Sequence, residues 1–453
     1  MIRWLAALWL AVAAPALATP EPVADVTVAR DGKSWAADYR LLERAPVWVF
    51  PESVLPRESR KSWRIGTVRV LTPGVILQRL GNYDALVSRK GPLPRRLRLS
   101  FTPFTKDIEA GYDPALVLTD GSVALYADQF KLVPMKSVAA VRSADRDSAS
   151  LPAIDHPTRM TFVDRAGPLL FKGERVVRAE LTDGSAYVLF GKAQPAIGPA
   201  MTTLLDPALP HWISASLNDD LPRILGLYRE WLGPSPIGQP TLLVSWAGPT
   251  PKTISMGGSV LPGMVVMTFE GEGVVEPNDK ARQYARWFVA HEAAHFWLGQ
   301  AVHYASPSES WITEGGADLL AFRATAKADP RYAVKARLAE ARSECAPFLA
   351  NGGIATAYQR PGDFRAYYAC GAIIALAAER ASKGDFAEFL RTLITRFGQD
   401  QVITRDEWLA LAEERSPGLA GAVRELLDKP HADGAGALDR FIQRTGIAGE
   451  FAA

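Results

Sequence analysis

The residues of this sequence best suited to chemistry lie in one short segment, His291-Glu292-Ala293-Ala294-His295. Two histidines four positions apart lie on the same face of a helix, so both imidazoles can reach one metal ion. Glu292 lies one position round the helix from His291 and would point towards a bound water. This H-E-x-x-H spacing is typical of zinc-dependent hydrolases, in which the glutamate is the general base.

A third metal ligand of suitable type follows at Glu314, eighteen residues after His295. Two histidines and one carboxylate leave the fourth zinc position open for water, which distinguishes catalytic zinc from structural zinc. Asp318 lies one helical turn beyond Glu314 and could orient a ligand histidine. It could also be a solvated acidic residue near a helix start. The pattern predicts one zinc ion per chain.

A purely structural explanation of the histidines also fits the local pattern. A helix expected to begin near Asn278 or Asp279 would place both histidines on a stripe with Tyr284 and Trp287. Histidines on such a stripe can be ordinary core residues. A zinc-stabilised binding module without catalysis is a further alternative, although a structural site has no need for the base Glu292.

Over a longer segment the sequence resembles the gluzincin peptidases, in particular the membrane alanyl aminopeptidase and leukotriene A hydrolase family. That family reads H-E-x-x-H-x-W-x-G-N and, after the same eighteen-residue spacing, W-L-N-E-G-x-A; this chain has HEAAHFWLGQ and WITEGGA. Trp297, Gly299, Trp311, Gly315 and Ala317 agree with the family. The resemblance implies zinc, a thermolysin-like catalytic domain and peptide or protein substrates, with epoxide or ester hydrolysis on the same scaffold as the alternative.

The resemblance also implies a tyrosine that donates a hydrogen bond to the reacting carbonyl oxygen. The family carries it in a Y-E-K-G motif, and this chain has Tyr368-Ala369-Cys370-Gly371. The matching Gly371 favours Tyr368 as this catalytic donor. Tyr367 is the alternative.

The sequence departs from the family in the strand that borders the cleft. The family motif G-x-M-E-N holds the substrate's free amine with its glutamate, whereas this chain reads MGGSVLPG from Met256. Gly257 and Gly258 could still let an extended substrate pair with a sheet edge. The glutamate is not matched, since Glu270 and Glu272 lie at shifted positions. The sequence therefore leaves aminopeptidase and endopeptidase activity open and favours the endopeptidase.

The N-terminus predicts export. Arg3 precedes the apolar run WLAALWLAVAA, and Ala16-Leu17-Ala18 is a typical cleavage signature. An apolar run of about a dozen residues is shorter than the roughly 20 needed to cross a bilayer. We therefore expect a signal peptide over residues 1–18 and a periplasmic or secreted protein without an integral membrane segment.

Composition and cysteine content add three expectations. A net charge of +2 gives no electrostatic case for binding nucleic acid. Cys345 and Cys370 could form a disulfide in an exported chain, with two buried free thiols as the alternative. Nothing in the sequence indicates an oligomeric state.

Patterning along the chain predicts an α+β protein with three parts after the signal peptide. Residues 19–205 read as a β-rich domain, with tight hairpins expected at Asp120-Gly121 and Asp183-Gly184. Residues 206–400 read as a thermolysin-like domain with a small sheet and zinc-binding helices. Residues 401–453 read as helices packed on that domain.

Overall fold

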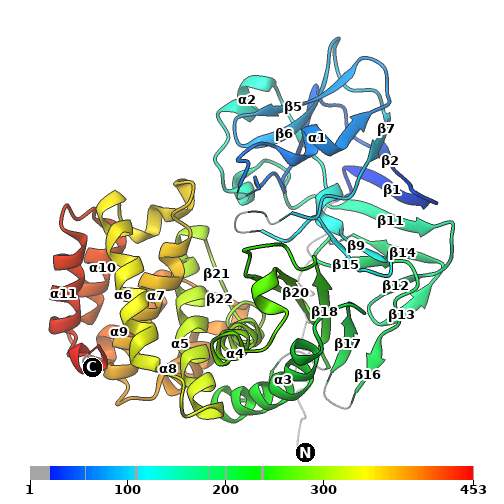
Figure 1. The fold of residues 1–453 in the computed structure, drawn as a ribbon. Coiled ribbons are helices and arrows are strands. Elements are labelled where there is room, and N and C mark those ends of the chain that lie inside the picture. The colour runs from blue at the N-terminus through cyan, green and yellow to red at the C-terminus, as the bar shows by residue number, and fades with distance from the viewer. Residues whose placement is uncertain are drawn as a thin grey trace, which may run out of the picture.

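The computed structural model describes residues 21–451 except 57, 107, 109, 110, 183, 199, 200 and 236–238. The expected signal peptide, residues 1–18, therefore lies outside the described residues. Strands dominate the first half of the described chain and helices the second half (Figure 1). The expected α+β class is confirmed.

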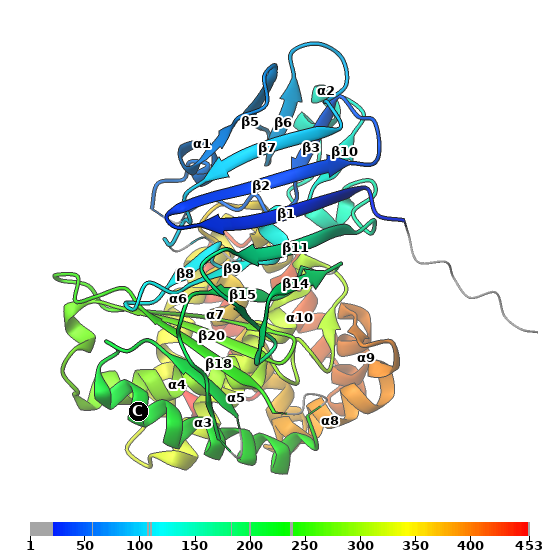
Figure 2. The same ribbon diagram turned by 90° about the vertical axis from the view of Figure 1, so that its right-hand side faces the viewer.

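Three sheets build the N-terminal half. The first has the order β14 (Arg178–Leu181), β11 (Thr158–Asp164), β1 (Ala24–Asp31), β2 (Ser34–Leu41), β7 (Arg96–Phe101) and β4 (Val68–Val70). The second has the order β10 (Val133–Met135), β3 (Val47–Phe50), β6 (Tyr83–Ser88) and β5 (Val75–Leu80). The third has the order β13 (Glu174–Val176), β12 (Leu169–Phe171), β15 (Tyr187–Phe190), β9 (Val123–Tyr126) and β8 (Ala115–Val117). Figure 2 shows β11, β1, β2 and β7 side by side in one layer.

Alternating side chains explain why these strands form sheets with a core on one face. Buried residues alternate with more exposed ones along β2, from Trp35 to Leu41. This period of two is what a strand with one covered face requires. Buried residues of the first and third sheets, among them Phe162 and Phe190, belong to one hydrophobic cluster.

One expected hairpin forms and the other does not. The strands β8 and β9 pair antiparallel around Asp120 and Gly121, and Gly121 has the positive φ of +83° that the turn requires. Asp183 lies outside the described residues. The strands that flank it, β14 and β15, pair with β11 and with β9 and β12 respectively, so the expected hairpin at Asp183-Gly184 is wrong. The chain crosses from one sheet to another at this point.

A five-stranded sheet begins the second half, in the order β16 (Ala196–Ile197), β17 (Thr202–Leu205), β18 (Thr241–Trp246), β20 (Met264–Glu270) and β19 (Ser255–Leu261). The strands β17, β18 and β20 are parallel, and β19 is the antiparallel edge strand. One face, with Val265 and Met267, packs against α3 (His211–Leu232) and α4 (Asp279–Ala294). The other face, with Leu243 and Val266, packs against the third N-terminal sheet. The central strands β18 and β20 are thus buried on both faces.

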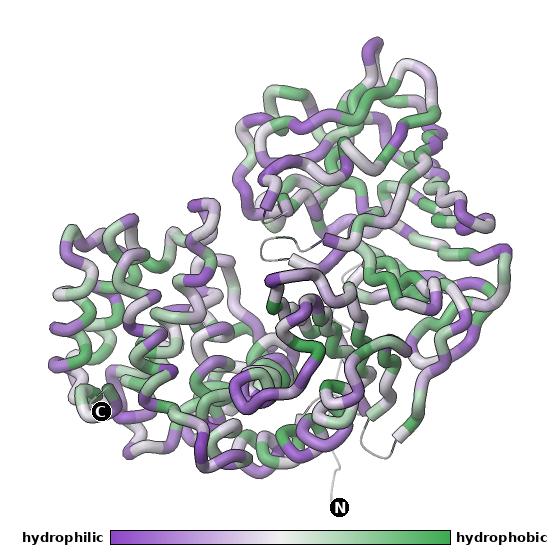
Figure 3. Tube along the Cα trace, in the orientation of Figure 1, coloured by the Kyte–Doolittle hydropathy of each residue, from purple (hydrophilic) through white to green (hydrophobic). Residues whose placement is uncertain are grey.

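Helices follow to the C-terminus: α5 (Ser310–Ala328), α6 (Val334–Asn351), α7 (Arg365–Ala381), α8 (Phe386–Phe397), α9 (Arg405–Arg415), α10 (Leu419–Asp428) and α11 (Gly434–Arg444). The helices α9, α10 and α11 lie within residues 401–453, where the sequence predicts helices. Hydrophobic and hydrophilic residues alternate along the outer helices in Figure 3, as expected where one helix face packs on the core. No described helix is both long and apolar enough to cross a membrane.

Candidate metal centre

The helix α4 presents the H-E-x-x-H residues to the interior. It begins as the sequence indicated, since the Asn278 side chain caps it by accepting a hydrogen bond from the Ala281 N–H at 2.8 Å. Near its end, the Tyr228 hydroxyl of α3 donates to the Ala290 carbonyl at 2.9 Å. His291 and Glu292 are 4% and 5% exposed. The last turn of the helix is thereby held inside the fold.

Three ligand atoms converge at the end of α4. His291, His295 and Glu314 each offer one atom, and these atoms lie within 4.8 Å of one another. The two Nε2 atoms are 3.1 Å apart, and each lies 3.4 Å from Oε2 of Glu314. Glu314 reaches them from the second turn of α5. The structure therefore brings together the three residues that the spacing selects.

The hydrogen bonds of the histidines decide which nitrogen faces the centre. Nδ1 of His291 lies 2.8 Å from Oδ1 of Asp318, and Nδ1 of His295 lies 2.8 Å from the Leu298 carbonyl oxygen. Both partners accept, so both Nδ1 atoms donate and both Nε2 atoms keep a lone pair. Asp318 thus occupies the place of a residue that orients a ligand histidine.

The donor set fits a zinc ion. Two Nε2 lone pairs and a carboxylate oxygen face one point, and Glu314 Oε2 is buried without a hydrogen-bond donor among the residues that the structure describes. Three acceptors that face each other repel unless a proton or a cation lies between them. Two imidazoles and one carboxylate suit zinc in its catalytic, three-ligand form.

The charges of the centre influence one another strongly. Burial opposes a charge on His291, but Asp318 and Glu314 outweigh it and raise the pKa of His291 to about 10. Burial would raise the pKa of Glu314, yet the two histidines hold it well below its usual range.

Glu292 lies beside the edge strand of the sheet. A Cβ atom placed on Gly258 of β19 would lie 2.8 Å from Oε1 of Glu292 and 2.6 Å from Cζ of Phe288. Only a glycine lets the strand approach so closely. Burial raises the pKa of the Glu292 carboxyl group, an effect that the neighbouring histidines oppose.

The helices α5 and α7 bring a tyrosine to the same centre. Gly315 and Gly371 face each other so closely that a Cβ on Gly315 would lie 2.1 Å from the Gly371 carbonyl carbon. One turn before Gly371, the ring of Tyr368 stacks on His291 with centroids 5.5 Å apart. The Tyr367 hydroxyl instead donates to the Ala355 carbonyl and accepts from the Tyr358 N–H. Of the two tyrosines, Tyr368 therefore faces the metal centre.

Other predicted residues lie outside the centre. Glu270 pairs with Ser255 across the hairpin and its carboxylate accepts from the Thr250 hydroxyl. Glu272 is exposed in a 3-10 turn. Cys345 and Cys370 form a disulfide that joins α6 to α7.

Sequence reasoning missed two tyrosines near the centre. The Tyr112 hydroxyl donates to the Val260 carbonyl of β19 at 3.0 Å. Tyr304, in β21 (His303–Tyr304), lies close enough to Glu314 for that carboxylate to add to the effect of burial and raise the Tyr304 pKa. No local pattern marks either residue, because both reach the centre only through tertiary contacts.

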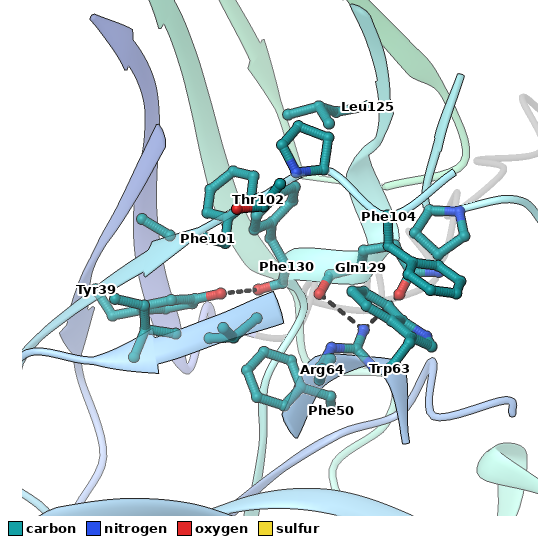
Figure 4. A pocket seen from close by; sticks show the side chains of 15 residues that line it. Tyr39, Phe50, Trp63, Arg64, Phe101, Thr102, Phe104, Leu125, Gln129 and Phe130 are labelled. Carbon is teal, nitrogen blue, oxygen red and sulfur yellow. Dashed lines mark hydrogen bonds between the residues drawn. The ribbon is translucent and has the colours of Figure 1, made fainter. Parts of the chain in front are cut away.

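A cavity in the N-terminal half is separate from this centre. It is lined mainly by aromatic and aliphatic side chains, and the guanidinium of Arg64 lies between the rings of Phe50 and Trp63, 4.5 and 4.4 Å from their centroids (Figure 4). Arg64 donates to Gln129 and pairs with Asp84 at 3.5 Å. Its polar groups are thus engaged within the protein, and the arrangement holds α1 (Trp63–Thr67) against the strands. The pattern of RIGTVRVL, residues 64–71, predicts a strand, so the helix α1 differs from the sequence prediction.

Comparisons with known proteins agree with this geometry. Residues 265–429 match the model of the peptidase family M1 domain. The fold is similar to that of an M1 zinc metallopeptidase from Deinococcus radiodurans, with a TM-score of 0.50, 17% identity, and coverage of 91% of this chain and 94% of that one. It is also similar to an aminopeptidase N family protein from Idiomarina loihiensis (0.61, 13%, 93% and 78%) and to leukotriene A4 hydrolase from Saccharomyces cerevisiae (0.53, 15%, 91% and 68%). No curated protein matches the chain.

Proposed function

Since residues 265–429 match the peptidase family M1 domain, we propose that this chain is a zinc metallopeptidase that hydrolyses peptide bonds with Glu292 as general base and Tyr368 as hydrogen-bond donor. One zinc ion per chain would be held by His291, His295 and Glu314. The observation that carries the proposal is the convergence of these three ligand atoms beside Glu292 and the ring of Tyr368.

The chain's own residues supply the base and the donor. Zinc, when bound, would polarise the scissile carbonyl and make a water more acidic. Glu292 would accept a proton from the attacking water and return it to the leaving amine. Burial raises the Glu292 pKa, which makes the carboxylate a stronger base. The Tyr368 hydroxyl would donate to the carbonyl oxygen as negative charge develops there.

The substrate would lie along the edge of β19. Among the residues that the structure describes, this strand pairs with β20 on one side only, and Gly257 and Gly258 are exposed. Val260 has no charged group, and neither Glu270 nor Glu272 places a carboxylate next to Gly258 that could hold a free amine. A peptide with a blocked N-terminus should therefore be accepted.

Replacing the base tests the mechanism. Glu292→Gln keeps the size of the side chain, so zinc content and peptide binding should persist while kcat falls by a factor of about 10³ or more. Glu272→Gln is the matched control, because this exposed glutamate lies outside the centre. Parent-like hydrolysis by Glu292→Gln would refute the mechanism. Zinc binding without hydrolysis of any peptide, ester or epoxide by the parent would favour a binding module.

Acetylation of the peptide N-terminus tests whether the protein binds a free amine of the substrate. We expect kcat/KM for one peptide to change less than about tenfold when its N-terminus is acetylated. A charge-assisted contact inside a cleft is strong, so a loss of 100-fold, about 2.7 kcal/mol, would reveal a dedicated amine site.

We also propose that the protein acts outside the cytoplasm. The apolar segment before Ala18 supports this proposal. The disulfide between Cys345 and Cys370 supports it independently, because disulfides persist in oxidising compartments. N-terminal sequencing of the mature protein from a fractionated source would test both the cleavage site and the compartment.

A further inference from the structure

The edge strand β19 is open at one end and covered at the other. Ser255, Gly257 and Gly258 are exposed, whereas Val260 is half-buried and Leu261 is buried. A substrate strand therefore meets exposed backbone on one side of Gly258 and a more buried edge on the other, and the Gly258 carbonyl accepts a hydrogen bond from the Ser259 hydroxyl at 2.7 Å.

The register of the hairpin shows which groups of β19 face outwards. Leu261 and Met264 pair across a two-residue turn, so they form a hydrogen-bonded pair. Hydrogen-bonded and non-hydrogen-bonded pairs alternate along an antiparallel ladder. The backbone groups of Gly258 and Val260 consequently point away from β20, towards the place that a substrate strand would occupy.

Tyr112 already forms a hydrogen bond with one of these outward backbone groups. Its hydroxyl donates to the Val260 carbonyl at 3.0 Å, a contact between residues 148 positions apart in the chain. Its ring packs on Tyr126 of β9, with centroids 4.8 Å apart. A side chain held by the N-terminal half thus ends the free edge two residues beyond Gly258.

The contact with Val260 places the phenol two residues along β19 from Gly258, which lies against Glu292. Burial raises the pKa of Tyr112, and Tyr304, Glu52, Glu292 and Glu314 raise it further. Two of these groups are the proposed base and a zinc ligand. Tyr112 is therefore near enough to the reacting bond to influence which peptides fit.

We propose that Tyr112 limits peptide substrates to about two residues on the N-terminal side of the scissile bond. The inference rests on the proposed function. Gly258 contacts Glu292, so the bond to be cleaved would lie near Gly258. Antiparallel pairing is the commoner arrangement, and a substrate antiparallel to β19 would place its N-terminal residues towards Val260. Two extended residues span about 7 Å, which is the stretch from Gly258 to Val260.

This limit on N-terminal length does not require a carboxylate that binds the substrate's free amine. A single residue with an acetyl group, or a dipeptide unit, would fit before Tyr112, whereas a longer N-terminal extension would meet its ring. The geometry favours an exopeptidase that releases short N-terminal units over the endopeptidase that the sequence favours.

Two peptide series test the limit on the zinc-loaded protein. They share one scissile pair and are extended by one to six residues on either the N-terminal or the C-terminal side. For the parent, kcat/KM should fall at least tenfold once a third residue is added on the N-terminal side and should change less than threefold on the C-terminal side. Tyr112→Ala should raise kcat/KM at least tenfold for the long N-terminal series. For the shortest peptides, kcat/KM should change less than threefold. Tyr112→Phe, which keeps the ring but frees the Val260 carbonyl, should give a smaller gain of about threefold.

The controls separate this inference from the proposed function. Tyr83→Phe removes a hydroxyl that donates to Asp145 in the N-terminal half and should leave the length profile unchanged. Peptide binding to zinc-loaded Glu292→Gln, followed by calorimetry, gives the same length profile without turnover and with Tyr112 intact. Equal tolerance on both sides, a limit on the C-terminal side, or a parent-like profile in both Tyr112 variants would overturn the inference alone. Absence of both binding and hydrolysis for every peptide would overturn the proposed function.

Discussion

Gly315 of α5 and Gly371 of α7 lie backbone against backbone, with no room for a Cβ on either residue. Glu314 precedes the first glycine by one position, and Tyr368 precedes the second by three. The close crossing therefore fixes the positions of a proposed zinc ligand and of the proposed donor together. Side chains that approach the centre from separate helices keep their geometry because the helices themselves cannot separate or slide.

Asp318 should control zinc affinity. Asp318→Asn weakens the acceptor for Nδ1 of His291 without changing its size, so zinc affinity should fall about 10–100-fold. Competition with a chromogenic chelator measures this change. Asp439→Asn, at a partly exposed ion pair with Arg342, is the control and should bind zinc like the parent. Equal affinities for the two variants would remove Asp318 from the centre.

Substitution of Tyr368 should affect catalysis, whereas substitution of the neighbouring Tyr367 should affect stability. Tyr368→Phe should lower kcat about 10²–10³-fold with a smaller effect on KM, because its donor acts mainly in the transition state. Tyr367→Phe should retain kcat but lose about 1 kcal/mol of unfolding free energy, since two half-buried backbone groups lose their partner. Steady-state kinetics and urea unfolding of both variants distinguish these outcomes. The reverse pattern would make Tyr367 the donor.

Adjacent glycines in β19 form a matched pair. Gly258→Ala places a methyl group against Glu292 and Phe288 and should lower kcat/KM about 100-fold, because a small misplacement of a base is costly. Gly257→Ala meets no atom within 4 Å and should stay within about threefold. Zinc content should be unchanged in both. Equal activities would show that the close contact has no part in catalysis.

Glu52 should make the fold less stable as the pH rises. Burial raises the pKa of this carboxyl from 4.5 to about 7, with Asp128 adding to the effect and Arg64 and Lys131 opposing it. Below about pH 4.5 the group is neutral in both folded and unfolded chains. Between pH 4.5 and 7 the unfolded chain releases its proton first, so stability falls as the pH rises through this window.

Glu52→Gln removes this titration. The variant should be about 1–3 kcal/mol more stable than the parent at pH 8, after allowance for the partial exposure of the group, and equal to it at pH 4. Chemical unfolding at the two pH values measures the difference. A variant that is less stable than the parent at pH 8 would show that the ionised carboxylate is stabilising.

The disulfide should stabilise the helix that carries Tyr368. Cys345 and Cys370 are 25 residues apart, and a loop of this length is worth about 3 kcal/mol in the chain-entropy model. The double variant Cys345→Ser/Cys370→Ser should lose about 2–4 kcal/mol of unfolding free energy. Unfolding with and without a reductant should differ for the parent and coincide for the variant. No effect of reductant on the parent would contradict the bond.

The residues of the metal centre could be predicted from the sequence because most of them lie close together along the chain. His291, Glu292 and His295 share one helix end, and Glu314 and Asp318 share the next helix. Gly257 and Gly258 could be placed at a sheet edge because they correspond to the G-x-M-E-N strand of the family that the sequence resembles. Tyr112 could not be found in this way, since its contact with Val260 depends on how the two halves of the chain pack.

The incorrect hairpin has a similar explanation. An Asp-Gly pair between strands is a strong local signal, yet β14 and β15 gain more by joining two different sheets than by pairing with each other. The helix α1 also forms where the local pattern predicts a strand, because Arg64 is buried with its guanidinium between the rings of Phe50 and Trp63. In both places tertiary packing outweighs local preference.

The open edge of β19 exposes the molecule to its own copies. A strand that can accept a peptide can also accept the same strand from a second molecule, and edge-to-edge pairing of this kind leads to aggregation. Glycines at positions 257 and 258 offer an approaching strand no side chains to pack against, and Tyr112 shortens the register over which such a pair could extend. The features that would adapt this edge to a short substrate therefore also limit the length of strand that a second copy could pair with.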